Sequence, residues 1–370
     1  MKKSSILPRF PHQFFYFTGL RVRRMCSLLS SRLVPPAVAV YEKAQGFWIS
    51  QALVAACELD LAGHLSQGPK PVSELAVLCQ ADETNLYRLL RALAGEGIFE
   101  ELPGRVFRNT RLSEPLIDKE NSIKYMILHQ FGSTNLALFS RFTECIRTGE
   151  GNAEKVLGSS IFQYMGDHPG RGEIYNKAMD HSSRMVVVPL LSAYDFSGIR
   201  HLTDIGGGRG ILLAHILQHY PHMQGTLFDL PRVVEEATHI AETFGVQERL
   251  RIFPGDFSES IPAGADAYFM KNILHAFDDE KCLGLLKKIH AAMLPEGKLI
   301  ILETVPARDN RPAFGKLADL LMMAGSVGGR ERSREDFEAL LHRSGFRISK
   351  LVRTMAPFHV IEAVKQNMSV

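Results

Sequence analysis

The 370-residue sequence lacks the features that mark several classes of protein. None of its cysteines forms a C-x-x-C pair, which argues against a disulfide framework and for a reducing, cytoplasmic location; they are Cys26, Cys57, Cys79, Cys145 and Cys282. No run of eighteen apolar residues occurs, so we expect no membrane span. The motifs H-E-x-x-H, G-x-S-x-G and the Walker lysine are also absent. We therefore predict no metal, no acyl hydrolysis and no phosphoryl transfer.

Acidic side chains are missing from residues 1–36, a segment that holds seven of the 43 Lys and Arg residues. The remainder has 36 basic against 40 acidic residues, a net charge of −4. We interpret residues 1–36 as a disordered basic extension. An upstream start codon, with Met25 as another possible start, is an equally favoured interpretation. The alternatives are a transit-like segment and a nucleic-acid arm.

The length favours two domains. Residues 37–112 predict a helix, a second helix over 83–94 and a hairpin around 103–104, which is a winged-helix-like order. The second helix carries few basic residues, so we favour a dimerisation or lid module over nucleic-acid binding. The nearly all-round apolar stretch from 38 to 65 indicates burial against another subunit.

The rest of the chain divides into residues 113–196, predicted as a helical linker that lines a substrate cleft, and residues 197–370. In the latter, strands are expected near 202–205, 225–228, 250–253, 266–270, 298–303 and 358–363, with helices between them. This alternation predicts an α/β fold with a doubly wound, mostly parallel sheet. Ligands bind at the carboxyl ends of such strands.

The segment HLTDIGGGRGILLAHILQHYPHMQGTLFDLPR, residues 201–232, is the strongest signal. It predicts a strand, a glycine turn with Gly206 and Gly208, a helix, and a second strand that ends at Asp229. An acidic residue there suits ribose hydroxyls. The spacing is G-x-G-x-G, not that of dinucleotide binders, and Asp204 is placed to receive an ammonium group. These features favour S-adenosylmethionine over a purely structural turn.

Two residues follow the third predicted strand of this domain. Asp256 is suited to accept a hydrogen bond from an adenine amino group, while Phe257 is suited to stack on the ring. A turn-capping role for Asp256 is the alternative.

Further polar residues follow the next two strands. Lys271 and His275 come after the fourth, Glu303 ends the fifth, and Glu331 lies before a later helix. A carboxylate that accepts from one imidazole nitrogen leaves the other nitrogen basic. We therefore predict His275 as a general base framed by the two glutamates. The alternatives are that Glu331 is only a charge at a helix N-terminus and that Glu303 only pairs with a nearby Lys or Arg.

The ordered motifs TDIGGGRG, GTLFDLPRVVEEA, GDF, MKNILHAFDDEKC, LPEGKLIILE and GGRERSREDFEALLHRSGF carry a resemblance. From about residue 38 to 365 the chain resembles the S-adenosylmethionine-dependent O-methyltransferases of the plant caffeic acid and flavonoid type. That group includes acetylserotonin O-methyltransferase and bacterial polyketide enzymes. The resemblance implies an intertwined homodimer and a small aromatic hydroxyl substrate, with no nucleic acid or membrane partner.

The resemblance also implies roles for individual residues. His275, Glu303 and Glu331 would be catalytic, and Met179 and Met322 would grip the aromatic acceptor. The cofactor would be held by Asp204, Gly206, Gly208, Asp229, Asp256, Phe257 and Lys271. Many members carry Asp-Trp after the histidine where this sequence has Ala276-Phe277, a difference that bears on acceptor identity.

Two other functions are compatible with the same sequence. One keeps the fold and the bound cofactor for non-methylating chemistry, such as hydroxylation or decarboxylation. The other is a nucleic-acid-binding regulator that uses the winged helix and the basic segment, against which the net charge of −4 over the remainder of the chain argues.

Overall fold

The computed structural model describes residues 13–366, which belong to two units. The sheet unit comprises residues 137–169 and 183–366. The helical unit comprises residues 13–136 and 170–182. Helix α11 (Pro169–Ala193) contributes residues to both.

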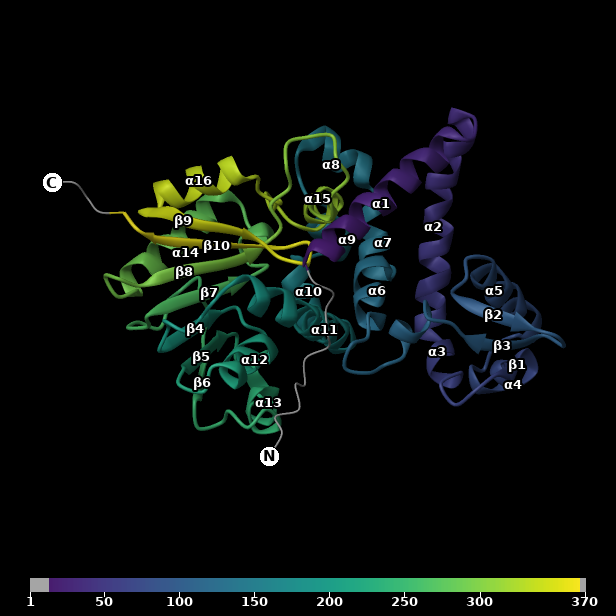
Figure 1. The fold of residues 1–370 in the computed structure, drawn as a ribbon, viewed down its shortest axis with the longest axis horizontal. Coiled ribbons are helices and arrows are strands. Elements are labelled where there is room, and N and C mark those ends of the chain that lie inside the picture. Colours follow the sequence, from purple (N-terminus) through teal and green to yellow (C-terminus); the bar gives the residue numbers. More distant parts are fainter. Residues whose placement is uncertain (1–12, 367–370) are drawn as a thin grey trace. The chain divides into compact units, whose positions relative to one another are not determined.

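The sheet unit is built on a sheet whose strands follow the order β6-β5-β4-β7-β8-β10-β9 (Figure 1). The first five of these strands pair in parallel, whereas β10 runs antiparallel to both β8 and β9. Their bounds are β4 (His201–Ile205), β5 (Gln224–Asp229), β6 (Leu250–Pro254), β7 (Ala267–Lys271), β8 (Lys298–Glu303), β9 (Phe346–Arg353) and β10 (His359–Lys365).

Helices cover both faces of this sheet because successive strand residues point to opposite sides. In β8, Ile300 and Leu302 join the core under α12 and α13, whereas Leu299 and Ile301 join the core under α14 and α16. The helices of this unit are α8 (Phe142–Thr148), α9 (Ala153–Leu157), α10 (Ile161–Asp167), α12 (Ile211–His219), η2 (Val234–Glu236), α13 (Ala237–Thr243), η3 (Leu274–Ala276), α14 (Asp279–Ala292), α15 (Phe314–Gly325) and α16 (Arg334–Arg343). The doubly wound, mostly parallel sheet predicted from the sequence is confirmed.

The six expected strands are present, and the structure adds edge strand β9. Its residues were not predicted as a strand because the alternation of side chains is interrupted. Ile348 pairs with Ala363 and Lys350 with Glu362, which leaves Ser349 as an extra residue at a β-bulge. A bulge shifts the apolar pattern by one residue, so the period of two is lost.

The helical unit contains the predicted order of helix, helix and hairpin. Helices α4 and α5 precede β2 and β3, and these two strands form an antiparallel sheet with the short β1. Buried residues of α2, α3, α4, α5 and the hairpin form one core. The elements are α1 (Gln13–Arg32), α2 (Pro36–Glu58), α3 (Leu61–His64), β1 (Lys70–Pro71), α4 (Val72–Leu78), α5 (Glu83–Gly95), β2 (Phe99–Leu102), β3 (Val106–Asn109), η1 (Glu114–Leu116) and α6 (Lys124–Phe131), with α7 (Ser133–Phe139) at its boundary.

The basic N-terminal segment differs from the expectation of disorder over residues 1–36. Residues Gln13–Arg32 form helix α1, while residues 1–12 lie outside the described part of the chain. No proline occurs between Pro11 and Pro35, and Leu, Arg and Met are good helix formers. Local propensity therefore favours a helix over this stretch despite its unbalanced charge.

Residues 113–196 are mainly helical, as expected, and they are divided between the two units. Among the helices of residues 13–366, none is both long and apolar enough to cross a membrane. All five cysteines are free thiols.

Candidate active site

The glycine turn after β4 needs glycine for both conformation and space. Gly206 and Gly208 have φ angles of +67° and +64°, in the left-handed region that other residues rarely adopt. A Cβ on Gly206 would lie 2.4 Å from the side chain of Ile273, whereas a Cβ on Gly208 would meet no atom within 4 Å. The turn is therefore packed against the segment after β7 at Gly206, and it is open at Gly208.

Asp229, at the end of β5, is tied to this turn by its carboxylate. Its Oδ2 accepts a hydrogen bond from the backbone N–H of Gly208 at 2.8 Å, and its Oδ1 accepts from that of Leu230 at 2.7 Å. Burial raises the pKa of Asp229, and the two backbone donors and Arg232 oppose this effect. Each carboxylate oxygen retains acceptor capacity beyond its backbone donor.

Asp204, near the end of the adjacent strand β4, is 2% exposed. Burial, reinforced by the nearby charge of Asp229, raises its pKa to about 7, and Lys271 opposes the rise. Asp204 is buried and Asp229 is half-buried, and two neighbouring carboxylates disfavour a second negative charge. A cationic group bound here would relieve that repulsion.

Asp256 and Phe257 follow β6. Asp256 Oδ1 accepts from the backbone N–H of Ser258 at 2.7 Å, so the turn-capping role considered for this residue is present. The ring of Phe257 lies edge-on to that of Phe277, with centroids 5.8 Å apart, and approaches the Cβ position of Gly206 at 3.8 Å. Phe257 thus borders the glycine turn.

These groups suit a ligand with an ammonium group, neighbouring hydroxyls and a flat heteroaromatic ring. The carboxylates of Asp204 and Asp229 are acceptors for the first two, the open space at Gly208 admits close approach, and Phe257 offers an aromatic surface. S-adenosylmethionine has these three parts, so the residues fit it. All of them lie in the sheet unit.

His275, on η3 after β7, forms a hydrogen bond with Glu331. Its Nδ1 lies 2.9 Å from Glu331 Oε1, and the two side chains are 16% and 2% exposed. A carboxylate accepts, so Nδ1 carries the proton and Nε2 is the basic nitrogen. Burial lowers the pKa of His275, but the bond to Glu331 and the charges of Glu303 and Glu331 outweigh it and raise the pKa above 6.5.

Glu303, at the end of β8, contacts the backbone beside His275. Its Oε1 accepts from the N–H groups of Ile273, Leu274 and His275 at 3.1, 2.7 and 3.3 Å. Burial and the charge of Glu331 raise the pKa of Glu303, while the charge of His275 opposes them. The two glutamates that were expected to frame the histidine therefore make different contacts. Glu331 bonds to the imidazole ring, and Glu303 bonds to the backbone N–H groups of residues 273–275.

Glu331 is itself held by its neighbours. Thr304 donates its hydroxyl to Oε2 of Glu331, and the backbone N–H of Glu331 donates to Asp319 at 2.8 Å. Two glycines bring this loop close to the histidine. A Cβ on Gly329 would lie 2.8 Å from the His275 carbonyl oxygen, and one on Gly328, where φ is +77°, would lie 2.7 Å from Asp278. The glycine pair therefore permits direct backbone packing.

The two methionines belong to different units. Met322 lies on α15 in the sheet unit, and Met179 lies on the part of α11 that belongs to the helical unit. Both are half-buried. Their joint contact with an acceptor stays a prediction.

Two residues of this site were not singled out from the sequence, namely Thr304 and Asp319. Thr304 directly follows Glu303, and this adjacency was the available signal. Asp319 lies within an amphipathic helix and carries no local signal. Within residues 13–366, no group of three or more His, Cys, Asp or Glu side chains is arranged to hold a metal ion.

Comparison with known proteins gives two family matches. Residues 139–347 match the O-methyltransferase domain, and residues 41–119 match the O-methyltransferase dimerisation domain. Among curated proteins, the mitomycin biosynthesis 6-O-methyltransferase of Streptomyces lavendulae is 36% identical over 86% of this chain and 91% of its own length. The phenazine O-methyltransferase of Lysobacter antibioticus is 32% identical over 89% of this chain and 96% of its own length.

A solved structure agrees with these matches. Human N-acetylserotonin methyltransferase in complex with S-adenosylmethionine superposes with a TM-score of 0.83 and 27% identity, over 90% of this chain and 99% of that one. These proteins are all named as methyltransferases, so the comparisons support methyl transfer and neither alternative function. The chain belongs to the S-adenosylmethionine-dependent O-methyltransferase family.

Proposed function

We propose that this O-methyltransferase methylates a phenolic hydroxyl of a small aromatic molecule and that His275 is its general base. The observation that carries the proposal is the 2.9 Å hydrogen bond from Nδ1 of His275 to Glu331. It leaves Nε2 unprotonated and able to accept a proton. The related enzymes named for mitomycin biosynthesis, phenazine and N-acetylserotonin support an aromatic acceptor.

A general base has a definite task in this reaction. A phenol has a pKa of about 10 and is mostly protonated at neutral pH, so it is a weak nucleophile. The cofactor, when bound, supplies an electrophilic methyl group on a sulfonium. Nε2 of His275 accepts the phenolic proton while Glu331 stabilises the imidazolium, a contribution of about 10² to 10⁴ in rate.

The cofactor site in this proposal consists of the residues around the glycine turn. Asp204 receives the ammonium group and Asp229 the ribose hydroxyls. The buried position of Asp204 and its raised pKa support the first role, because a bound cation offsets its repulsion with Asp229. The cofactor is also proposed to lie close to the backbone of Gly206 and Gly208. Asp256, Phe257 and Lys271 are proposed to complete its binding site.

The acceptor site is proposed to be largely apolar beside His275. Ala276 offers no polar side chain, and the ring of Phe277 stacks on that of Phe162 at 6.4 Å with an interplanar angle of 23°. Aromatic surfaces recognise a flat ring without fixing its polar substituents. Met322, on α15 of the same unit, is proposed to contact this acceptor.

We further propose that the protein is a homodimer. The match to the dimerisation domain over residues 41–119 supports this, as do exposed apolar side chains on α2. Val40, Tyr41, Phe47 and Trp48 are between 54% and 68% exposed. Such a cluster on one helix is typical of a surface that another chain covers.

The substitution Asp229→Asn tests the cofactor site. We expect the affinity for S-adenosylhomocysteine to fall about 10- to 100-fold, because a buried hydrogen bond to a charged group contributes about 1.5–3 kcal/mol. Isothermal titration provides the measurement. Asp266→Asn is the control, since Asp266 accepts from two backbone N–H groups at the opposite end of β4. Equal losses in both variants would reject the assignment of Asp229.

The substitution His275→Ala tests the general base. With a panel of phenols that includes N-acetylserotonin and a hydroxyphenazine, we expect turnover to fall about 10²- to 10⁴-fold while cofactor affinity is retained. Methyl transfer is followed with S-adenosylmethionine labelled in the methyl group. His342→Ala, at an exposed position of α16, should keep full turnover. Unchanged turnover in His275→Ala would contradict the proposal.

The pH profile provides a separate prediction. A base must be unprotonated, so kcat/KM should fall as the pH drops through the pKa of His275, which lies above 6.5. In Glu331→Gln the negative partner is lost while burial remains. The acid limb should therefore move to lower pH. Initial rates from pH 5 to 9 give the profile, and coincident acid limbs would show that Glu331 does not act on the base.

The substitution Trp48→Glu tests the dimer. A charge placed in a covered apolar surface should produce monomers at micromolar concentration, as measured by light scattering after gel filtration. Val77→Glu, at a 78% exposed position on α4, is the matched control and should remain dimeric. A wild-type protein that elutes as a monomer would reject this part of the proposal.

A further inference from the structure

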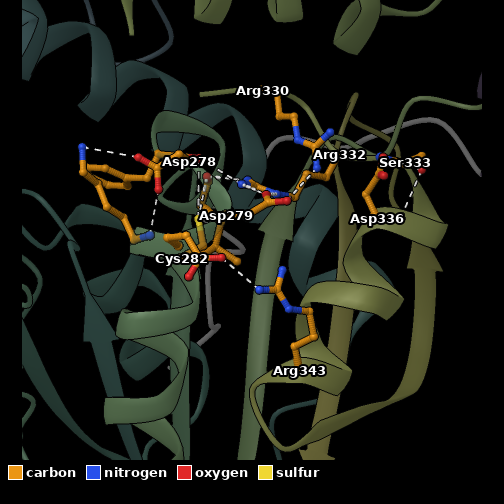
Figure 2. A network of polar contacts seen from close by, with 12 residues as sticks. Asp278, Asp279, Cys282, Arg330, Arg332, Ser333, Asp336 and Arg343 are labelled. Carbon is orange, nitrogen blue, oxygen red and sulfur yellow. Dashed lines mark hydrogen bonds and ion pairs between the residues drawn. The ribbon is translucent and has the colours of Figure 1, made fainter. Parts of the chain in front are cut away.

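Arg332, the residue after Glu331, has an arrangement that the reaction described above does not use. Its side chain is completely buried. Nη1 donates to the Leu274 carbonyl at 2.6 Å, and Nη2 donates to the Phe277 carbonyl at 2.9 Å. Nε and Nη2 both donate to Asp279 Oδ1, at 3.1 and 2.7 Å. Figure 2 shows this network around the first turn of α14.

The two carbonyl groups lie on either side of the histidine in the chain. Leu274 precedes His275 and Phe277 is two residues after it, so the guanidinium binds the backbone that carries the imidazole. Arg332 also adjoins the glutamate that bonds to the ring. His275 and Glu331 are 56 residues apart in sequence. Arg332, next to Glu331, therefore joins the Glu331 loop to the segment that carries His275.

Stability alone does not account for a charged residue here. Arg332 is fully buried, whereas its ion-pair partner Asp279 is 36% exposed, so desolvation of the guanidinium offsets much of its attraction to the carboxylate. The planar guanidinium, however, provides donors in fixed directions, whereas a lysine ammonium is a single flexible point. The fork matches the fixed positions of two carbonyls and a carboxylate, a geometry that a single ammonium nitrogen does not reproduce.

We propose that Arg332 is a positioning residue for methyl transfer, which clamps the His275 segment against the Glu331 loop and so keeps Nδ1 of His275 bonded to Glu331. Glu303 holds the N–H groups of residues 273–275, and Arg332 holds carbonyls of the same turn. The backbone around the base is thus bound through both its donors and its acceptors. This inference rests on the proposed role of His275.

Two neighbouring residues share part of the network and sharpen the assignment. Arg330 also donates to Asp279, at 2.9 Å, but its side chain is 47% exposed. The Cys282 thiol lies 3.3 Å from the Leu274 carbonyl and 3.7 Å from that of Phe277, and a thiol is a weak donor. Arg332 is therefore the strong donor to both carbonyls.

The first test needs no acceptor molecule. Long-range ¹H–¹⁵N spectra report the imidazole tautomer of His275, assigned by difference from His275→Ala. We expect the Nδ1–H tautomer in the wild type and in Arg330→Met, and a mixture of tautomers in Arg332→Met. An unchanged tautomer in Arg332→Met would overturn the proposal, because a residue that only stabilises the fold does not select which ring nitrogen is protonated.

The second test is a double-mutant cycle with the acceptor that gives methyl transfer in the wild type. Arg332→Met should lower kcat about 10- to 100-fold, since small misplacements of a catalytic group have effects of this size. Binding of S-adenosylhomocysteine should stay unchanged, and Arg330→Met should keep the wild-type kcat. In a His275→Ala background, Arg332→Met should cause no further loss, because residues that act as a unit are not additive.

The outcomes separate this inference from the proposed function. Equal losses from Arg332→Met in both backgrounds would overturn the positioning role and leave His275 as the base. Unchanged turnover in His275→Ala would overturn both. If Arg332→Met does not fold, Arg332→Lys completes the same cycle: it keeps the charge near Asp279 and should lose kcat only where His275 is present.

Discussion

The hydrogen bond between Nδ1 of His275 and Glu331 is the interaction on which the rest of the site depends. Its 2.9 Å distance requires two loops to meet although 56 residues separate them. Thr304 and Asp319 hold the glutamate, Glu303 holds the turn of the histidine, and Gly328 and Gly329 let the two backbones touch. A single geometric requirement thus explains why small, acidic and hydroxyl residues occur after β7, at the end of β8, and in and after α15.

The strand order connects this pair to the proposed cofactor residues. Strand β4 lies between β5 and β7, so Asp204, Asp229 and Lys271 lie at or near the carboxyl ends of neighbouring strands. The charge of Lys271 acts on both Asp204 and His275, and it opposes the rise in the pKa of each. Parallel strands bring their carboxyl ends to one edge, where ligands of doubly wound folds bind. The topology therefore places the carboxylates of Asp204 and Asp229 at the same edge of the sheet as Lys271 and the turn that carries His275.

Much of this architecture was predictable from the sequence because its signals are local. The glycine turn, Asp229 and the alternation of strands and helices each follow from a short pattern, and His275 was identified by its place after a strand. The different contacts of Glu303 and Glu331 were not predictable, since they depend on which oxygen meets the ring and which meets the backbone. Strand β9 was missed because the bulge at Ser349 interrupts its pattern. Helix α1 was not predicted because the excess of basic side chains in residues 1–36 favoured disorder, although the helix propensity of residues 13–32 is high.

The Cys282 thiol beside the Leu274 carbonyl has a consequence for chemoselectivity. Sulfur is a better nucleophile toward an alkylating sulfonium than oxygen is, and only the thiolate reacts readily. Burial raises the pKa of Cys282 to about 12, although Arg332 opposes the rise. The Cys282 sulfur, which contacts the two carbonyls beside the proposed base, is therefore held as the thiol, the form that reacts poorly with an alkylating sulfonium.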